Sequence, residues 1–151
     1  MVTADQTYAD PSALACIYLH QPEKSRQMIA WRAGATGALA VTHHGKAEIT
    51  NAICRARFTG ELDEFGLESA LTNFGADFAD GHLLQADLLW RSALNRSAEL
   101  SRIHTPTLGT RASDVLHVAC ALELKLRHFL TFDDRQGKLA AAVGLKLIKL
   151  A

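Results

Sequence analysis

The chain has 151 residues, of which 48% are hydrophobic and 21% are charged, a balance typical of a globular protein with one well-filled core. Its 16 basic and 16 acidic residues cancel, which argues against strong non-specific binding of nucleic acid, because such binding grows with the number of neutralised phosphates. The charges are unevenly spread: residues 61–100 hold eight acids and two bases, and residues 101–151 hold eight bases and four acids. We therefore expect a neutral protein with a more basic C-terminal part.

The composition also indicates a cellular location. No apolar run reaches the roughly 18 residues that a membrane-spanning helix needs, and the start of the chain, MVTADQTYAD, lacks the regions of a signal peptide. We expect a cytoplasmic protein with no membrane partner. The odd number of cysteines, far apart among apolar neighbours, predicts buried, reduced thiols rather than disulfides. These are Cys16, Cys54 and Cys120.

Strands and helices are expected to alternate along the first half of the chain. Apolar periodicity, Pro11 and Pro22 at first-turn positions and the stop at Gly34 define these elements. In chain order we expect a strand at 7–10, a helix at 11–19, a helix from Pro22 to Gly34, a strand at 38–42, and helices at 46–58 and 61–75.

The second half continues the alternation. In chain order we expect a short strand or extended link at 81–84, a helix at 86–102, a long polar loop at 104–113, a helix at 114–126 with Ser113 as N-cap, a strand at 128–132, a helix at 134–143 and a strand at 145–148. No repeat or linker interrupts the chain, so we expect a single domain over residues 1–151. The alternation predicts an α/β fold, with a central parallel sheet of four to five strands flanked by helices.

Four acids fall where ligands bind in such a sheet, beyond the carboxyl ends of its strands. Asp10 and Asp133 each end a strand, Asp114 lies in the first turn of a helix, and Glu48 lies near the start of the helix after the 38–42 strand. Mutual repulsion of carboxylates costs stability, and a divalent cation removes that cost. Oxygen ligands of this kind suit Mg²⁺ or Mn²⁺.

Each acid also has an ordinary structural explanation. An acid at a helix start, such as Asp114 or Glu48, is commonly a cap or a partner of the helix dipole. Asp133 or Asp134 after a strand serves equally well as a turn residue, and Asp10 before a proline is a good N-cap. The joint pattern, rather than any one acid, indicates a metal site.

The local sequences around these acids resemble one family. YADPSAL, EITNAICR, SDVLHVACALEL and FLTFDDRQGKLAAAVGLKL, in this order, resemble the PIN-domain ribonucleases, particularly the VapC-type toxins. The resemblance covers about residues 7–150. It departs from the family at Pro11, where Thr is frequent, and at Thr110 and Arg111, which occupy variable positions.

The resemblance implies a PIN-like three-layer fold and a metal-dependent endoribonuclease, the toxin of a VapBC-type toxin–antitoxin pair. It implies that Asp10, Glu48, Asp114 and Asp133 bind Mg²⁺ or Mn²⁺ and carry the catalysis. It further implies an RNA substrate, a cognate antitoxin and a homodimer. The antitoxin tail would dock on the acidic segment 61–100, although ordinary core packing also explains its apolar residues, Leu62, Phe65, Leu71, Phe74 and Leu83.

Several further residues have two interpretations each. Ser12 either orients Asp10 or caps the helix, and Asp134 either starts the last helix or supports the metal site. Arg111 and Arg135 either hold the RNA backbone or are ordinary surface arginines.

The remaining polar candidates are also ambiguous. Arg55 either approaches phosphate or pairs with Glu48, and His117 is either a ligand or, preferably, a packing residue. His43 and His44 are expected in a solvated loop, because no third ligand stands at a zinc-like spacing. Trp31 and Trp90 are expected to pack in the core or at a dimer contact.

Two other functions remain open. One is a catalytically silent PIN-like binding or regulatory module, which direct measurement of Mn²⁺ binding would separate from an enzyme. The other is a nuclease acting on DNA flaps, which is disfavoured because the chain has no room for a domain that grips duplex DNA.

Overall fold

The computed structural model describes residues 2–151, so Met1 of the expected 1–151 domain lies outside the described residues. The strands are β1 (Thr7–Ala9), β2 (Leu39–Thr42), β3 (Leu83–Ala86), β4 (His128–Leu130) and β5 (Lys146–Leu147). The helices are α1 (Pro11–Leu14), α2 (Pro22–Gly34), α3 (His43–Phe58), α4 (Glu64–Ala79), α5 (Trp90–Leu108), α6 (Ala112–Glu123) and α7 (Asp134–Ala142), with single 3₁₀ turns at Ala4–Gln6 and Ala15–Ile17.

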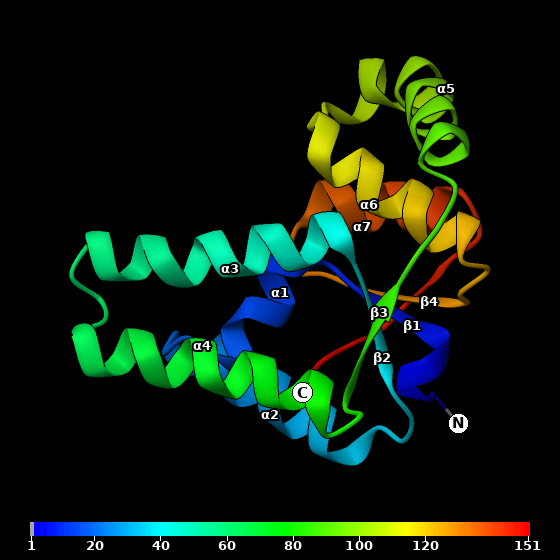
Figure 1. Cartoon of the computed structure of the whole chain (residues 1–151). Coiled ribbons are helices and arrows are strands. Elements are labelled where there is room, and N and C mark those ends of the chain that lie inside the picture. The colour runs from blue at the N-terminus through cyan, green and yellow to red at the C-terminus, as the bar shows by residue number, and fades with distance from the viewer. Residues whose placement is uncertain (1) are drawn as a thin grey trace.

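The strands are parallel and lie at the centre of the molecule (Figure 1). Hydrogen bonds join β1, β4 and β5 into one sheet, in the order β1-β4-β5, and join β2 to β3 in a second. The two sheets meet where β1 lies beside β2. The parallel sheet that was expected with four to five strands is therefore found as a three-stranded and a two-stranded parallel sheet, and not as one hydrogen-bonded sheet.

Helices cover both faces of β1 and β4. Tyr8 and Phe129 point into one apolar cluster, and the next residues along their strands, Ala9 and Leu130, point into another. The first cluster is closed by α5, α6 and α7, and the second by α1, α2, α3 and α4 (Figure 1). Because successive side chains of a strand face opposite ways, strands covered on both sides must be apolar throughout. The α/β class with flanking helices is confirmed.

Two cysteines are buried as expected and one is not. Cys16 and Cys120 are buried, and burial raises the pKa of the Cys120 thiol to about 11. Cys54 is exposed, so the expectation of three buried thiols is wrong for this residue. It follows Ile53, which faces the core from α3, and one step along a helix turns a side chain by about 100° away from its neighbour.

Among residues 2–151, no helix has both the length and the apolar character that crossing a membrane requires.

Helix α3 begins three residues before the predicted start at 46. Thr42, the last residue of β2, is its N-cap, and the Thr42 hydroxyl oxygen accepts a hydrogen bond of 2.9 Å from the Gly45 backbone. Gly45 suits this close approach, because a Cβ there would lie 3.2 Å from that oxygen. His43 and His44 therefore belong to the first helical turn, and the prediction of a solvated loop is wrong.

The long polar loop predicted at 104–113 is also wrong. Helix α5 continues through Pro106 to Leu108 and ends at Gly109, whose φ of +67° is the left-handed conformation that favours glycine. Helix α6 then begins at Ala112 with Arg111 as N-cap. Ser113 is not the cap, because its hydroxyl donates to Glu48. Only residues 109–111 separate the two helices.

Several other boundaries shift because of local pairing. The first helix is shorter than 11–19, since α1 ends at Leu14 and passes into a 3₁₀ turn. Strand β3 extends to Ala86, because it pairs in register with all of β2, and this delays the start of α5 to Trp90. Strand β4 ends at Leu130, two residues earlier than expected.

Candidate functional site

Asp10 lies directly after β1, where it caps α1 and is only 4% exposed. Ser12 donates to Asp10 Oδ2 twice, from its backbone nitrogen (3.1 Å) and from its hydroxyl. Gln136 Nε2 donates to the other oxygen, Oδ1, at 2.9 Å. Of the two expected roles of Ser12, capping belongs instead to Asp10, and Ser12 orients the Asp10 carboxylate through these two bonds. The result is a buried carboxylate held in a single orientation.

Gln136 connects the segments that carry the three aspartates. It is completely buried, and its Nε2 also donates to the backbone oxygen of Asp114 at 3.2 Å. Its backbone nitrogen donates to Asp133 Oδ1 at 2.9 Å, and its Oε1 accepts from the Thr131 hydroxyl at 2.6 Å. Sequence reasoning did not single out this residue. The available signal was its position three residues after the N-cap Asp133, the spacing of a capping box.

The three aspartates interact electrostatically. Burial raises the pKa of Asp114, and the negative charges of Asp10 and Asp133 raise it further. The charges of His117 and Arg111 oppose this shift but do not cancel it. Asp10, Asp114 and Asp133 thus form an aspartate group whose mutual repulsion is only partly compensated by the protein.

A hollow of about 440 Å³ opens at the aspartate group. Its lining includes Asp114 and Asp133 together with Arg111 and Arg135. Arg135 Nη1 donates to the Gly109 carbonyl at 3.4 Å, which holds the arginine against the α5–α6 connection. Basic and acidic side chains therefore line the same depression.

Asp134 is separate from the other three aspartates in its contacts. It starts α7, as expected, and its strongly exposed carboxylate pairs with Lys138 at 3.1 Å. Asp133, by contrast, is the N-cap that holds Gln136. The two adjacent acids thus have different environments.

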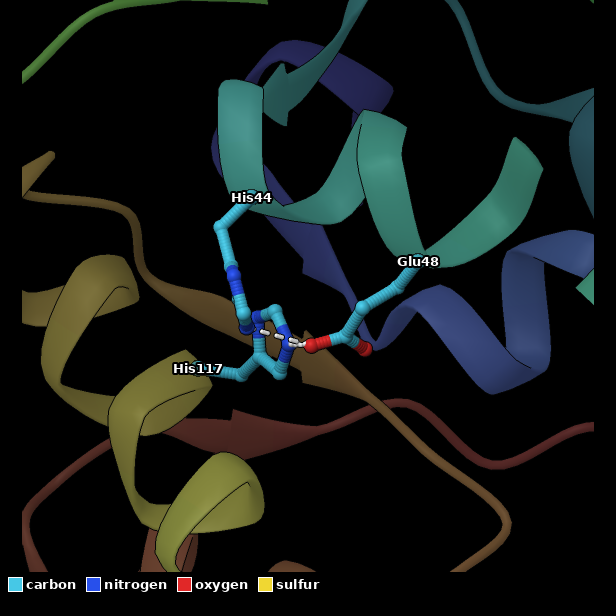
Figure 2. Close-up of side chains that lie close together, drawn as sticks. All are labelled: His44, Glu48 and His117. Atoms are coloured by element: carbon cyan, nitrogen blue, oxygen red, sulfur yellow. Dashed lines mark hydrogen bonds and ion pairs between the residues drawn. The ribbon is translucent and has the colours of Figure 1, made fainter. Parts of the chain in front are cut away.

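Glu48 makes different contacts from the aspartates. Glu48 Oε1 accepts a hydrogen bond of 2.9 Å from the Ser113 hydroxyl, lies 3.0 Å from His117 Nε2 and is in ion-pair contact with His44 Nε2 (Figure 2). Burial pushes the pKa of Glu48 upward, but the hydrogen bonds from His117 and Ser113 and the charges of the two histidines outweigh it and lower that pKa.

His44, Glu48 and His117 form the histidine cluster. Their ligand atoms all lie within 4.8 Å of one another, and no other group of three possible metal ligands meets this limit within the described part of the chain. The four acids predicted to converge are therefore divided, with three aspartates near one another and Glu48 held by histidines. The sequence did contain a signal for this cluster. His44 and Glu48 are four residues apart, so they lie on the same face of a helix that begins at His43.

Arg55 lines a second hollow of about 460 Å³, together with Glu48 and Ser12. Of its two expected roles, pairing with Glu48 is not found, since the ion-pair partners of Glu48 in residues 2–151 are His44 and His117. Arg55 therefore lies in the hollow beside Glu48, where its charge is available to a ligand.

No model of a known protein family matches the sequence, and no curated protein matches it significantly.

Proposed function

We propose that the protein is a PIN-type, metal-dependent endoribonuclease that acts as the toxin of a VapBC-type toxin–antitoxin pair. The observation that carries the proposal is the aspartate group. Three carboxylates from three segments lie near one another, although their oxygens do not all come within 4.8 Å. Burial raises the pKa of Asp114, and the charges of Asp10 and Asp133 raise it further. Carboxylates whose repulsion is left uncompensated are suited to a hard divalent cation.

The residues fit Mg²⁺ or Mn²⁺. Asp114 and Asp133 line the open hollow, and Asp10 is oriented from both sides by Ser12 and Gln136. These three would hold the ion, and Glu48 would complete the set from α3. When bound, such an ion lowers the pKa of an attacking water and neutralises charge on the phosphate.

The chain's own side chains would position the substrate. Arg111 and Arg135 line the same hollow as the acids and would bind phosphate oxygens of an RNA strand on one side. Arg55 would do the same in the second hollow, on the side of Glu48. Ser12 and Gln136 keep Asp10 in place during the reaction. We expect products with a 5′-phosphate and a 3′-hydroxyl.

A cognate antitoxin and a homodimer are part of the proposal. Phe74 and Leu83 of the predicted docking segment are buried, so core packing explains them. Phe65, however, is 80% exposed at the start of α4, and Phe58 is 87% exposed at the end of α3. Two exposed phenylalanines at the same turn are suited to a protein partner. The mass of the purified chain in solution tests the dimer.

A catalytically silent PIN-like module is the second candidate. It is favoured by Glu48, which the histidines and Ser113 already engage, so that one of the four proposed ligands is not free. Such a module would bind no Mn²⁺ at the aspartate group and would cleave no RNA.

The test uses purified protein, RNA and Mn²⁺. We expect cleavage that stops when a chelator removes the metal and that is lost in Asp10→Asn, whose fold is checked by circular dichroism. Asp134→Asn, an exposed acid outside the group, is the matched control and should cleave as the wild type does. Undiminished cleavage in chelator, or by Asp10→Asn, would refute the proposed mechanism, and no cleavage by the wild type would favour the silent module.

A further inference from the structure

The histidine cluster brings two imidazoles and a carboxylate together from two helices. His44 and Glu48 lie one turn apart on α3, and His117 approaches them from α6 (Figure 2). Both histidines present Nε2 to the same oxygen, Glu48 Oε1. This donor set differs from that of the aspartate group, which offers oxygen alone.

His117 is held in a fixed orientation. It is 1% exposed, and its Nδ1 lies 2.6 Å from the Tyr8 hydroxyl. When Nδ1 carries the proton and donates it to Tyr8 Oη, the lone pair of Nε2 is free and directed at the cluster. Metal-binding histidines are commonly fixed in this way, by a hydrogen bond from the ring nitrogen that does not bind the metal.

His44 supplies an independent observation. Its Nε2 is buried and has no hydrogen-bond partner in residues 2–151, although it is in ion-pair contact with Glu48. The contact is therefore short without being aligned as a hydrogen bond. The His44 ring is confined by the His117 ring, whose centroid is 5.3 Å away, and by the edge of Trp90. A buried, unsatisfied ring nitrogen directed into a group of ligands is the condition that a bound metal ion relieves.

We propose that His44, Glu48 and His117 bind one Zn²⁺ ion. Zinc accepts imidazole nitrogen and carboxylate oxygen together, whereas Mg²⁺ prefers oxygen ligands. His44 and Glu48 are each about one-third exposed as side chains, at 39% and 34%, so water has access to the ion. Three protein ligands leave the fourth tetrahedral position to that water.

Zinc at this site would have a consequence for the aspartate group. Glu48 belongs to both sets of ligands, so zinc would keep it on the side of the histidines and away from Mg²⁺ or Mn²⁺. This consequence rests on the proposed function, but the zinc site itself does not.

The test is calorimetric titration of the metal-free full-length chain with Zn²⁺ alone, without RNA. We expect one Zn²⁺ per chain, bound in the micromolar range or tighter, and binding about tenfold weaker or worse in His44→Ala and His44→Gln. His43→Ala is the matched control, because His43 is the exposed neighbour of His44 in the same helical turn. It should bind zinc as the wild type does. Melting temperatures of the metal-free variants show that each is folded.

A second variant separates this proposal from the proposed function. Asp10→Asn should bind zinc as tightly as the wild type, whether or not the protein cleaves RNA. No zinc binding by the wild type, or equal binding by His44→Ala and wild type, would overturn the proposal. Binding that is lost in Asp10→Asn but kept in His44→Ala would place the ion at the aspartate group and would overturn it as well.

Discussion

Helix α6 contributes one residue to each of two neighbouring groups that differ in how their charge is compensated. Asp114 belongs to the aspartate group, where burial and, after it, the nearby carboxylates raise its pKa. His117, one turn later, belongs to the histidine cluster. In that cluster the partners of Glu48 lower the pKa of the carboxylate, against the effect of burial. The same helix thus contributes to a group of acids whose repulsion the protein compensates only in part and to a cluster whose acid has several partners.

The largest expected effect is the loss of catalysis in Asp114→Asn. A metal ion at this site would supply several kcal/mol of charge stabilisation, and about 1.4 kcal/mol corresponds to a tenfold change in rate. We therefore expect RNA cleavage to fall by about 10²- to 10³-fold. The rate of Mn²⁺-dependent cleavage of a labelled RNA measures this. A decrease of less than about tenfold would show that the aspartate group is not the reaction centre.

Gln136→Met should have the next largest effect. It removes the donor to Asp10 Oδ1 and to the Asp114 carbonyl while keeping a side chain of similar size. We expect cleavage to fall by about 10- to 100-fold and half-maximal activity to need more Mn²⁺, with a loss of about 1–3 kcal/mol in the free energy of unfolding. An unchanged Mn²⁺ dependence would show that Gln136 only supports the fold.

The adjacent acids Asp133 and Asp134 provide a matched pair for a third test. Asn is as good an N-cap as Asp, so Asp133→Asn removes the charge and keeps the bond to the Gln136 backbone. We expect cleavage to fall by about tenfold or more in Asp133→Asn, because Asp133 is one of the proposed metal ligands. Asp134 lines the same hollow, but its exposed carboxylate pairs with Lys138. Asp134→Asn should therefore change cleavage by less than about twofold. Equal losses would contradict the different roles assigned to the two acids.

The smallest expected effect is on the unfolding temperature, and it has opposite signs in the aspartate group and the histidine cluster. The folded-state pKa of Asp114 is raised, so its charge destabilises the fold above that pKa, and Asp114→Asn should unfold at a higher temperature at pH 7. The folded-state pKa of Glu48 is lowered, so its charge stabilises the fold, and Glu48→Gln should unfold at a lower temperature.

Both differences should amount to a few degrees at most. The Asp114 difference should fade as the pH falls to about 4, near the pKa of an unfolded aspartate. The Glu48 difference should fade only at lower pH, as the pH falls through the lowered folded-state pKa of Glu48. Calorimetric unfolding of metal-free protein between about pH 3 and pH 7 measures both differences. Shifts of the same sign at pH 7 would remove the contrast between the two groups.

Local sequence predicted much of this arrangement. The alternation of apolar strands and amphipathic helices predicted parallel strands with helices on both faces, and the acids after β1 and β4 were expected at the strand ends. Those features depend on periodicity and on residues close in the chain. The proximity of Asp10 and Asp133 follows from the parallel pairing of β1 with β4. The position of Asp114 does not, because α6 follows another helix.

The rest depends on contacts between distant segments. The contact between Glu48 and His117 requires a particular packing of α3 against α6, which neither helix encodes by itself. The position of His44 depends on the Thr42 cap, which moves the start of α3 by three residues from the predicted position. The role of Gln136 depends on complete burial between two segments, and a polar residue in a helix start gives no sign of burial until the fold is known.

The central claim is that the aspartate group cleaves RNA, and one measurement tests it most directly. Wild type and Asp10→Asn are expressed briefly at equal levels, and the 5′-phosphate ends of cellular RNA are sequenced. We predict new, recurrent cleavage sites with the wild type and none with Asp10→Asn. The same ends in both samples, or no new ends with the wild type, would contradict the claim.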